Sequence, residues 1–171
     1  AWDSSTKNLR VLDAAEHRII VFDSSGAMKA KYGTRGSGPG EFNFPAGLAI
    51  APGASVIVAD SMNFRVQLID HEGRPTSSFG KKGDAAGDFA LPRDTAVDSE
   101  GHIYVLDNQF ENIQIFDKTG QLLMSLGQEG RGPGEFYLPA GITIDSLDRI
   151  WVADTYNRRV QVFQYLRETT P

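Results

Sequence analysis

Carboxylates at a repeated position are the residues of this sequence best suited to ligand chemistry. Each lies 47 residues from the next, and two of them are followed at fixed spacing by Asn and Arg. Such a set could form a ring of ligand-binding groups, or it could cap tight turns while Arg pairs with the carboxylate. Because the set returns in successive units, we expect the structural role. Its members are Asp13, Asp60, Asp107 and Asp154, with Asn63, Arg65, Asn157 and Arg159.

Histidines and nucleophiles show no convergent pattern. His17, His71 and His102 fall at different places in the repeated units, which argues against a zinc site. The sequence has no cysteine and no Gly-x-Ser-x-Gly segment, so it carries no signature of nucleophilic catalysis. We therefore expect no catalytic residue, no metal and no cofactor, and we favour a chain that is not an enzyme.

Glycine-rich segments precede each predicted sheet. Gly-Pro-Gly-Glu-Phe occurs at residues 38–42 and again at 132–136. A phosphate loop would continue with Gly-Lys-Ser/Thr and a helix, and neither follows here. We expect these segments to be connectors in which Phe42, Phe89 and Phe136 plug the space between units.

The elements that position these residues are short strands. Residues 47–50, 56–59, 65–69 and 76–79 are apolar or alternating runs separated by Gly, Pro, Asn and Asp. Valine and isoleucine favour strands, and no helical period is sustained. Four strands in a 47-residue repeat are typical of one blade of a β-propeller. The sequence therefore predicts an all-β propeller of four-stranded antiparallel blades, at about residues 1–33, 34–80, 81–127 and 128–171.

Composition narrows the choice of partners. The 171 residues have a net charge of −5, so the overall field does not attract nucleic acid or anionic lipid. No apolar run approaches the ~18 residues of a membrane-spanning helix. We expect no membrane insertion, and the overall charge disfavours nucleic-acid binding without excluding a local basic patch.

The repeated units resemble the NHL repeat. The resemblance is carried by a glycine-rich loop, a Phe-x-x-Pro-x-Gly segment, a strand ending in Asp, and Asn-x-Arg-Val-Gln. In the second unit these are Phe42, Pro45, Gly47, Asp60, Asn63 and Arg65-Val66-Gln67; in the fourth they are Phe136, Pro139, Gly141, Asp154, Asn157 and Arg159-Val160-Gln161. The resemblance, together with the compact cysteine-free repeats, favours a bacterial protein in an extracytoplasmic location, periplasmic or secreted, with a cytoplasmic location as the alternative.

The number of units is lower than the resemblance implies. NHL propellers usually close with about six blades, whereas about four units are present. Residues 1–3 resemble the end of a first strand, and residues 165–171 are barely enough for a last one. We expect that missing blades or another chain closes the arc, because open blade faces would otherwise expose apolar surface.

The third unit departs from the repeat on the face that carries the strand b–c and d–a loops. Arg93 and Asp94 replace Ala-Gly, Phe110 replaces Asn, and Asn112 replaces Arg. Such departures reflect either neutral drift or a function. The sequence therefore nominates Arg93, Asp94, Asn108 and Phe110 as a candidate binding patch.

Three functions fit this reading. We favour a non-catalytic scaffold that presents the b–c and d–a loops to a protein, peptide or glycan. The first alternative is a propeller-type lyase or lactonase whose metal site lies in blades outside this sequence. The second is single-stranded RNA binding, which requires a basic face with aromatic platforms.

Overall fold

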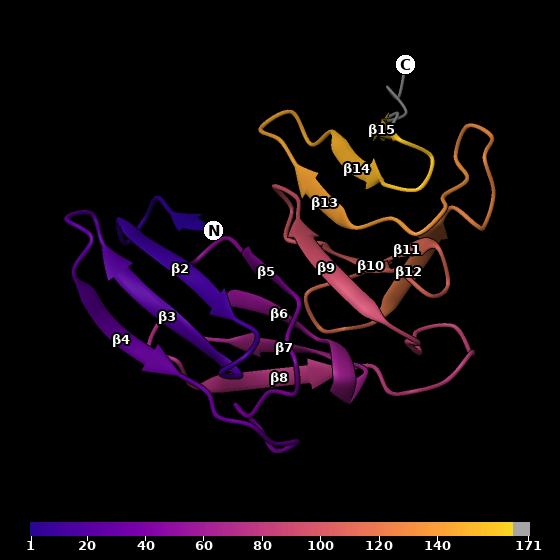
Figure 1. Cartoon of the computed structure of the whole chain (residues 1–171). Coiled ribbons are helices and arrows are strands. Elements are labelled where there is room, and N and C mark those ends of the chain that lie inside the picture. The colour runs from indigo at the N-terminus through magenta and orange to yellow at the C-terminus, as the bar shows by residue number, and fades with distance from the viewer. Residues whose placement is uncertain (166–171) are drawn as a thin grey trace.

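Fifteen strands form four antiparallel sheets in the computed structural model, which describes residues 1–165 (Figure 1). Each sheet is a meander of consecutive strands, and we call the sheets blades 1 to 4. Blade 1 contains β1 (Trp2–Asp3), β2 (Asn8–Asp13), β3 (Arg18–Asp23) and β4 (Met28–Tyr32), and blade 2 contains β5 (Gly47–Ile50), β6 (Val56–Asp60), β7 (Arg65–Ile69) and β8 (Pro75–Phe79). Blade 3 contains β9 (Pro92–Val97), β10 (Ile103–Asp107), β11 (Asn112–Phe116) and β12 (Leu122–Leu126), and blade 4 contains β13 (Gly141–Ile144), β14 (Ile150–Asp154) and β15 (Arg159–Phe163).

The predicted all-β propeller is confirmed, with differences at element ends. Ser61–Asn63, expected as a loop, forms a single 3-10 turn. The strand β9 begins at Pro92, so Arg93 and Asp94 lie within it rather than before it. The last predicted strand of blade 4 falls mostly on residues 166–171, outside the described residues.

The blades follow one another around an arc, with blade 1 and blade 4 at its two ends (Figure 1). The innermost strands of blades 2, 3 and 4 contact each other in order, β5 against β9 and β9 against β13. Together with β1 they line a central channel of about 400 Å³. Its lining combines apolar side chains such as Ala49, Ala96 and Ile142 with the polar residues Asp94, Thr95 and Thr143.

Three apolar clusters lie between successive blades and form the core. Phe42, Phe89 and Phe136 each have at most 1% of their surface exposed, as the connector interpretation requires. A β-carbon on Gly33 would meet the Phe42 ring at 2.5 Å, and Gly80 stands in the same relation to Phe89. Glycine at these positions, which have φ near +90°, therefore lets the backbone approach the aromatic plug.

A meander alternates its turns between two ends of the blade, which gives the propeller two faces. The loop face carries the connections between blades (β4–β5, β8–β9, β12–β13) and the turns between the second and third strand of each blade. The turn face carries the remaining hairpin turns. Aspartates cap backbone N–H groups in the hairpin turns, as Asp70 does for Glu72 and Arg74 on the turn face.

Candidate binding face

The aspartates that recur every 47 residues are held by hydrogen bonds within their own blades. Asp60 is fully buried and accepts bonds from the Asn43 N–H at 2.7 Å and from Asn63 Nδ2 at 2.8 Å. It also accepts bonds from Arg65 Nε at 2.9 Å and Gln67 Nε2 at 3.2 Å. Both carboxylate oxygens of Asp60 are therefore engaged by donors of the protein itself, so the role of this side chain is structural.

The arginines complete the same arrangement. Arg65 donates to the carbonyl oxygens of Ser37, Gly38 and Glu41 at 2.7 to 3.0 Å, and so ties the preceding connection to β7. Arg159 makes the same three contacts in blade 4, with Arg131, Gly132 and Glu135. Because the guanidinium group serves both the carboxylate and the loop, it is not available to a ligand.

Asp154 occupies the equivalent site in blade 4. Burial alone would raise the pKa of this carboxyl, but the Tyr137 N–H and the side chains of Asn157 and Arg159 hold it below its ordinary value. The carboxylate is consequently ionised in the folded protein at neutral pH, where it receives these donors.

The other two repeated aspartates differ. Asp107 in blade 3 is fully buried and bonds to backbone N–H groups of Ala90, Leu91, Gln109 and Phe110 at 2.8 to 3.1 Å. These N–H groups replace the missing Asn and Arg donors. Asp13 is 25% exposed and contacts Arg18 at 3.4 Å.

Two apolar side chains of the loop face are held exposed by an unusual backbone. Phe44 is 50% exposed with φ of 46°, and Leu138 is 40% exposed with φ of 47°. This left-handed region costs a residue with a side chain roughly 1–2 kcal/mol. Their N–H groups bond to the preceding blade, at His17 Nδ1 (3.0 Å) and Glu111 Oε1 (3.1 Å).

The connection from blade 2 to blade 3 shows why these acceptors matter. Phe64 stands at the position of His17 and Glu111, and its ring has no acceptor. The corresponding N–H, that of Leu91, turns instead to Asp107 of its own blade at 3.1 Å. Leu91 has no positive φ and is only partly exposed. A side-chain acceptor on one blade thus accompanies an exposed apolar residue on the next.

A recess of about 410 Å³ lies at the mouth of the channel on the loop face. Phe44, Leu12, Pro45 and Ala140 give it apolar walls, and the exposed side chain of Arg93 stands at it. Asp94 also lines the recess, where it accepts the Ile142 N–H at 3.0 Å. Burial raises the pKa of Asp94, although the N–H groups of Ile142 and Thr95 and the charge of Arg93 oppose it.

The structure brings together part of the nominated patch. Arg93 and Asp94 line the recess, whereas Asn108 and Phe110 are not among its lining residues. Asn108 donates through Nδ2 to the Pro139 carbonyl at 2.8 Å, which joins blade 3 to blade 4. Phe110 is half-buried rather than bare. The sequence reading did not nominate Phe44, whose exposure depends on a histidine 27 residues away.

Two glutamates of the connections bond to the backbone, whereas Asp84 and Glu129 on the same connections are exposed. Glu41 accepts the Gly38 N–H at 2.9 Å, and Glu135 accepts the Gly132 N–H at 2.8 Å. Neighbouring basic side chains remain exposed on the same face. They are Arg35, Lys81, Lys82, Arg93, Arg131 and Arg158. Glu41 and Glu135 are already bonded to the backbone.

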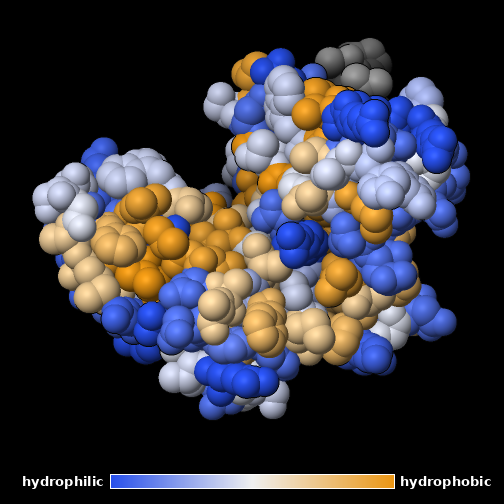
Figure 2. Space-filling view, in the orientation of Figure 1, coloured by the Kyte–Doolittle hydropathy of each residue, from blue (hydrophilic) through white to orange (hydrophobic). Residues whose placement is uncertain are grey.

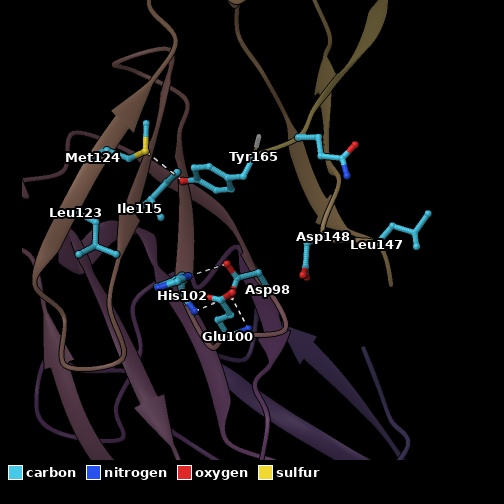
Figure 3. A pocket seen from close by; sticks show the side chains of 10 residues that line it. Asp98, Glu100, His102, Ile115, Leu123, Met124, Leu147, Asp148 and Tyr165 are labelled. Carbon is cyan, nitrogen blue, oxygen red and sulfur yellow. Dashed lines mark hydrogen bonds and ion pairs between the residues drawn. The ribbon is translucent and has the colours of Figure 1, made fainter. Parts of the chain in front are cut away.

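A second hollow, of about 770 Å³, lies between blades 3 and 4 toward the turn face (Figure 3). His102 Nδ1 lies 2.8 Å from Asp98 Oδ2, and the Tyr104 hydroxyl donates to the same oxygen at 3.2 Å. Blade 4 repeats this arrangement with Arg149 and Trp151 on Asp145 at 2.7 and 2.9 Å. The recurrence identifies a turn cap shared by blades 3 and 4.

Two further observations concern residues 1–165. They contain no group of three His, Asp or Glu side chains placed to hold a metal ion. They also contain no helix that is long and apolar enough to cross a membrane.

Comparison with known proteins defines the class. A family model described as "6-bladed beta-propeller" matches residues 3–64 and 97–169, which is most of the chain, so the chain belongs to this family. No curated protein sequence matches it.

Solved structures show the same fold. Virginiamycin B lyase from Staphylococcus aureus has a TM-score of 0.66 at 15% identity, with 98% of this chain and 55% of the lyase covered. A Bacteroides thetaiotaomicron protein of unknown function has a TM-score of 0.70 at 17% identity, with 94% and 45% covered. Glutaminyl cyclase from Myxococcus xanthus has a TM-score of 0.61 at 15% identity, with 94% and 72% covered. The chain spans about half the length of the lyase, and at these identities the likeness concerns the fold alone.

Proposed function

We propose that this chain is a binding module whose loop face holds a protein partner through a segment with apolar and acidic side chains. The observation that carries the proposal is the strained, exposed position of Phe44. Backbone strain persists where surrounding contacts enforce it, and it gathers at functional sites. Here His17 enforces a conformation that keeps an aromatic ring in water beside an apolar recess.

The chemistry of the partner follows from what surrounds the recess. Its apolar walls fit one aliphatic or aromatic side chain, as buried anchors of interfaces do. Arg93 supplies a cation beside it, and the other exposed basic residues of the loop face extend the positive charge. A partner carboxylate next to an apolar anchor would complement both features.

Exposed apolar residues enlarge this surface in each of two blades. Met62 is 47% exposed, and its N–H bonds to the Asn43 carbonyl beside Phe44. Tyr156 is 63% exposed, and its N–H bonds in the same way to the Tyr137 carbonyl beside Leu138. The repetition gives a partner two similar apolar contacts, one on blade 2 and one on blade 4.

The NHL character of the blades is part of this proposal. The contacts of Asp60, Arg65 and Gln67 recur at Asp154, Arg159 and Gln161, which supports a repeat of the NHL type. In that setting the loop face is the surface offered to partners.

A selection from a displayed random-peptide library against the chain tests the function. We expect selected peptides to pair an apolar residue with Asp or Glu, and to bind at least about tenfold more weakly to the Phe44→Ala, Arg93→Ala variant. Arg74→Ala is the matched control, because Arg74 is 69% exposed on the turn face. Peptides that bind this double variant as well as the original chain would refute the proposal.

The same variants separate the other functions. Binding to a glycan array that is lost with Phe44→Ala would keep the site but change the partner class. Single-stranded RNA that binds at low salt and is lost with Arg93→Ala would replace the protein partner. Stoichiometric calcium or zinc in a longer polypeptide that contains this sequence would favour the lyase or lactonase alternative.

A further inference from the structure

Blade 3 places a carboxylate where the neighbouring blades have glycine. Asp94 of β9 stands at the repeat position of Gly47 in β5 and of Gly141 in β13. A β-carbon on Gly47 would lie 2.7 Å from Asp94 Oδ1, and one on Gly141 would lie 3.6 Å from Oδ2. The carboxylate therefore lies between the innermost strands of blades 2 and 4, which have no side chain at the positions that face it.

Asp94 has no cation bound to it within the described part of the chain. Its Oδ1 accepts the Thr95 N–H at 2.9 Å and its Oδ2 accepts the Ile142 N–H at 3.0 Å, without an ion pair. The buried carboxylates of Asp60 and Asp154, in contrast, each pair with an arginine, at 2.9 and 2.7 Å. A carboxylate can accept about four hydrogen bonds, so Asp94 keeps acceptor capacity for a ligand.

The next residue of β9 is polar without a structural reason. Thr95 stands where blades 2 and 4 have Leu48 and Ile142. It is 3% exposed, and its Oγ1 has no hydrogen-bond partner. Buried polar atoms without a partner are few in native structures. The polar run that begins at Arg93 is therefore not explained by contacts that stabilise the blade.

The surroundings of Asp94 are mostly apolar. The residue lines both the recess of about 410 Å³ and the channel of about 400 Å³, and Phe44 and Leu12 belong to the recess wall. Figure 2 shows a hollow between the lobes of the first and last blades, with mostly hydrophobic surface along the side of the first blades. Burial accordingly raises the pKa of Asp94, although the charge of Arg93 opposes this. A cation supplied by a ligand would offset the cost of keeping the carboxylate ionised here.

The cation that suits this place carries an apolar group directly beside its charge. The first residue of a polypeptide has its α-ammonium group and its side chain on the same Cα, so it can reach Asp94 and the apolar recess wall together. A lysine holds its ammonium group at the end of a four-carbon stem, so the stem would fill the recess and leave no place for an apolar anchor. Capture of a free chain end is an established mode of peptide recognition.

We propose that the recess captures the free N-terminus of the partner segment. The α-ammonium group binds the Asp94 carboxylate, an apolar first side chain contacts Phe44 and Leu12, and a following Asp or Glu meets Arg93. This inference rests on the proposed function, and it adds which end of the partner binds and through which group. Asp94 gives the recess a selectivity for chain ends that Phe44 and Arg93 do not supply.

Paired synthetic peptides test the inference. Each begins with Leu, Ile or Phe, carries Asp or Glu at the second or third place, and is made with a free and with an acetylated N-terminus. Affinities are measured by fluorescence anisotropy near neutral pH, where the α-amino group is charged. We expect the free form to bind the chain at least about tenfold more tightly than the acetylated form.

Substitutions at Asp94 locate the effect. Asp94→Asn should weaken the free peptides to the level of the acetylated ones, and the acetylated ones should bind as before, which shows that the recess is intact. Asp94→Gly should act in the same way, because it restores the residue found in blades 2 and 4. Asp70→Asn is the matched control, since Asp70 caps a hairpin turn on the turn face. It should leave both affinities unchanged.

Four other outcomes would overturn the inference. Acetylated peptides that bind the original chain as tightly as free ones would leave the loop-face function standing but remove the chain end from it. Binding by neither form would refute the proposed function and the inference with it. A preference for free peptides that persists in Asp94→Asn and Asp94→Gly would take the role away from Asp94. Acetylated peptides that begin with Lys, bind as tightly as the free peptides and lose affinity in Asp94→Asn would assign the carboxylate to a lysine side chain.

Discussion

His17 holds Phe44 from the neighbouring blade in two ways. Its Nδ1 accepts the Phe44 N–H at 3.0 Å, and the two rings meet edge to face with centroids 4.7 Å apart. His17 is itself 6% exposed and has φ of 54°, so a buried residue in a left-handed conformation fixes an exposed one. This relationship joins blade 1 to blade 2 and shapes the recess.

Phe44→Gly should separate stability from binding. Glycine tolerates the φ of 46° at no steric cost, so the variant should exceed Phe44→Ala in free energy of unfolding by about 1 kcal/mol. Both variants should lose binding of selected peptides equally, since each removes the ring. Urea unfolding followed by tryptophan fluorescence measures the first effect. A glycine variant no more stable than the alanine variant would show that the backbone of Phe44 is not strained.

His17→Leu should loosen the same connection. The substitution keeps an apolar body but removes the acceptor, and leaving the Phe44 N–H unpaired costs about 1–3 kcal/mol. Amide exchange at Phe44 should accelerate. His71→Leu is the control, because His71 is 55% exposed in a hairpin turn. Exchange that is equally fast in both variants would argue that packing alone holds the loop.

Arg65→Met should be far more damaging than Asn112→Met at the equivalent position. Removing Arg65 breaks its ion pair with the fully buried Asp60, and losing one partner of a buried pair costs about 3–5 kcal/mol. The buried Asn112 Oδ1 has no partner, so its removal should cost little. Chemical unfolding of the two variants side by side measures the difference, and equal losses would contradict the structural assignment of Arg65.

The repeat made the blades predictable, because side-chain alternation and turn residues are local properties. Apolar and alternating runs bounded by Gly, Pro, Asn and Asp placed each strand of blade 2 within one residue of its observed bounds. The structural reading of Asp60 followed from its recurrence. Local patterns sufficed wherever a side chain bonds within its own blade.

The sequence predicted the aromatic plugs between blades, but not the hydrogen bonds that join one blade to the next. The strained exposure of Phe44 depends on His17, and the role of Asn108 depends on Pro139 of the next blade. The inward turn of Glu41 depends on the path of its glycine-rich connection. Spacing within a unit carries no information on which side chain of a neighbouring unit lies opposite.

Acid should weaken the fold through Asp154. Its folded pKa lies below the ordinary value of 3.8, so its stabilising contribution is complete above that pH and is lost as the pH falls through the folded pKa. The free energy of unfolding, measured by urea titration between about pH 2 and 6, should fall with acid. Asp154→Asn should flatten this dependence. An unchanged slope in the variant would assign the acid sensitivity to other carboxyls.

Restoring the repeat in blade 3 should reveal whether its departures serve binding. Phe110→Asn with Asn112→Arg rebuilds the pair that surrounds Asp60 and Asp154, and it adds charge-assisted bonds to the fully buried Asp107. The double variant should therefore gain about 1–3 kcal/mol in free energy of unfolding. If Phe110 is an anchor for the partner, peptides selected on the original chain should bind the stabilised variant more weakly, and Arg93→Ala should weaken them further. Stabilisation with unchanged affinity would instead identify the departures as drift and confine the binding site to Phe44, Arg93 and the recess between them.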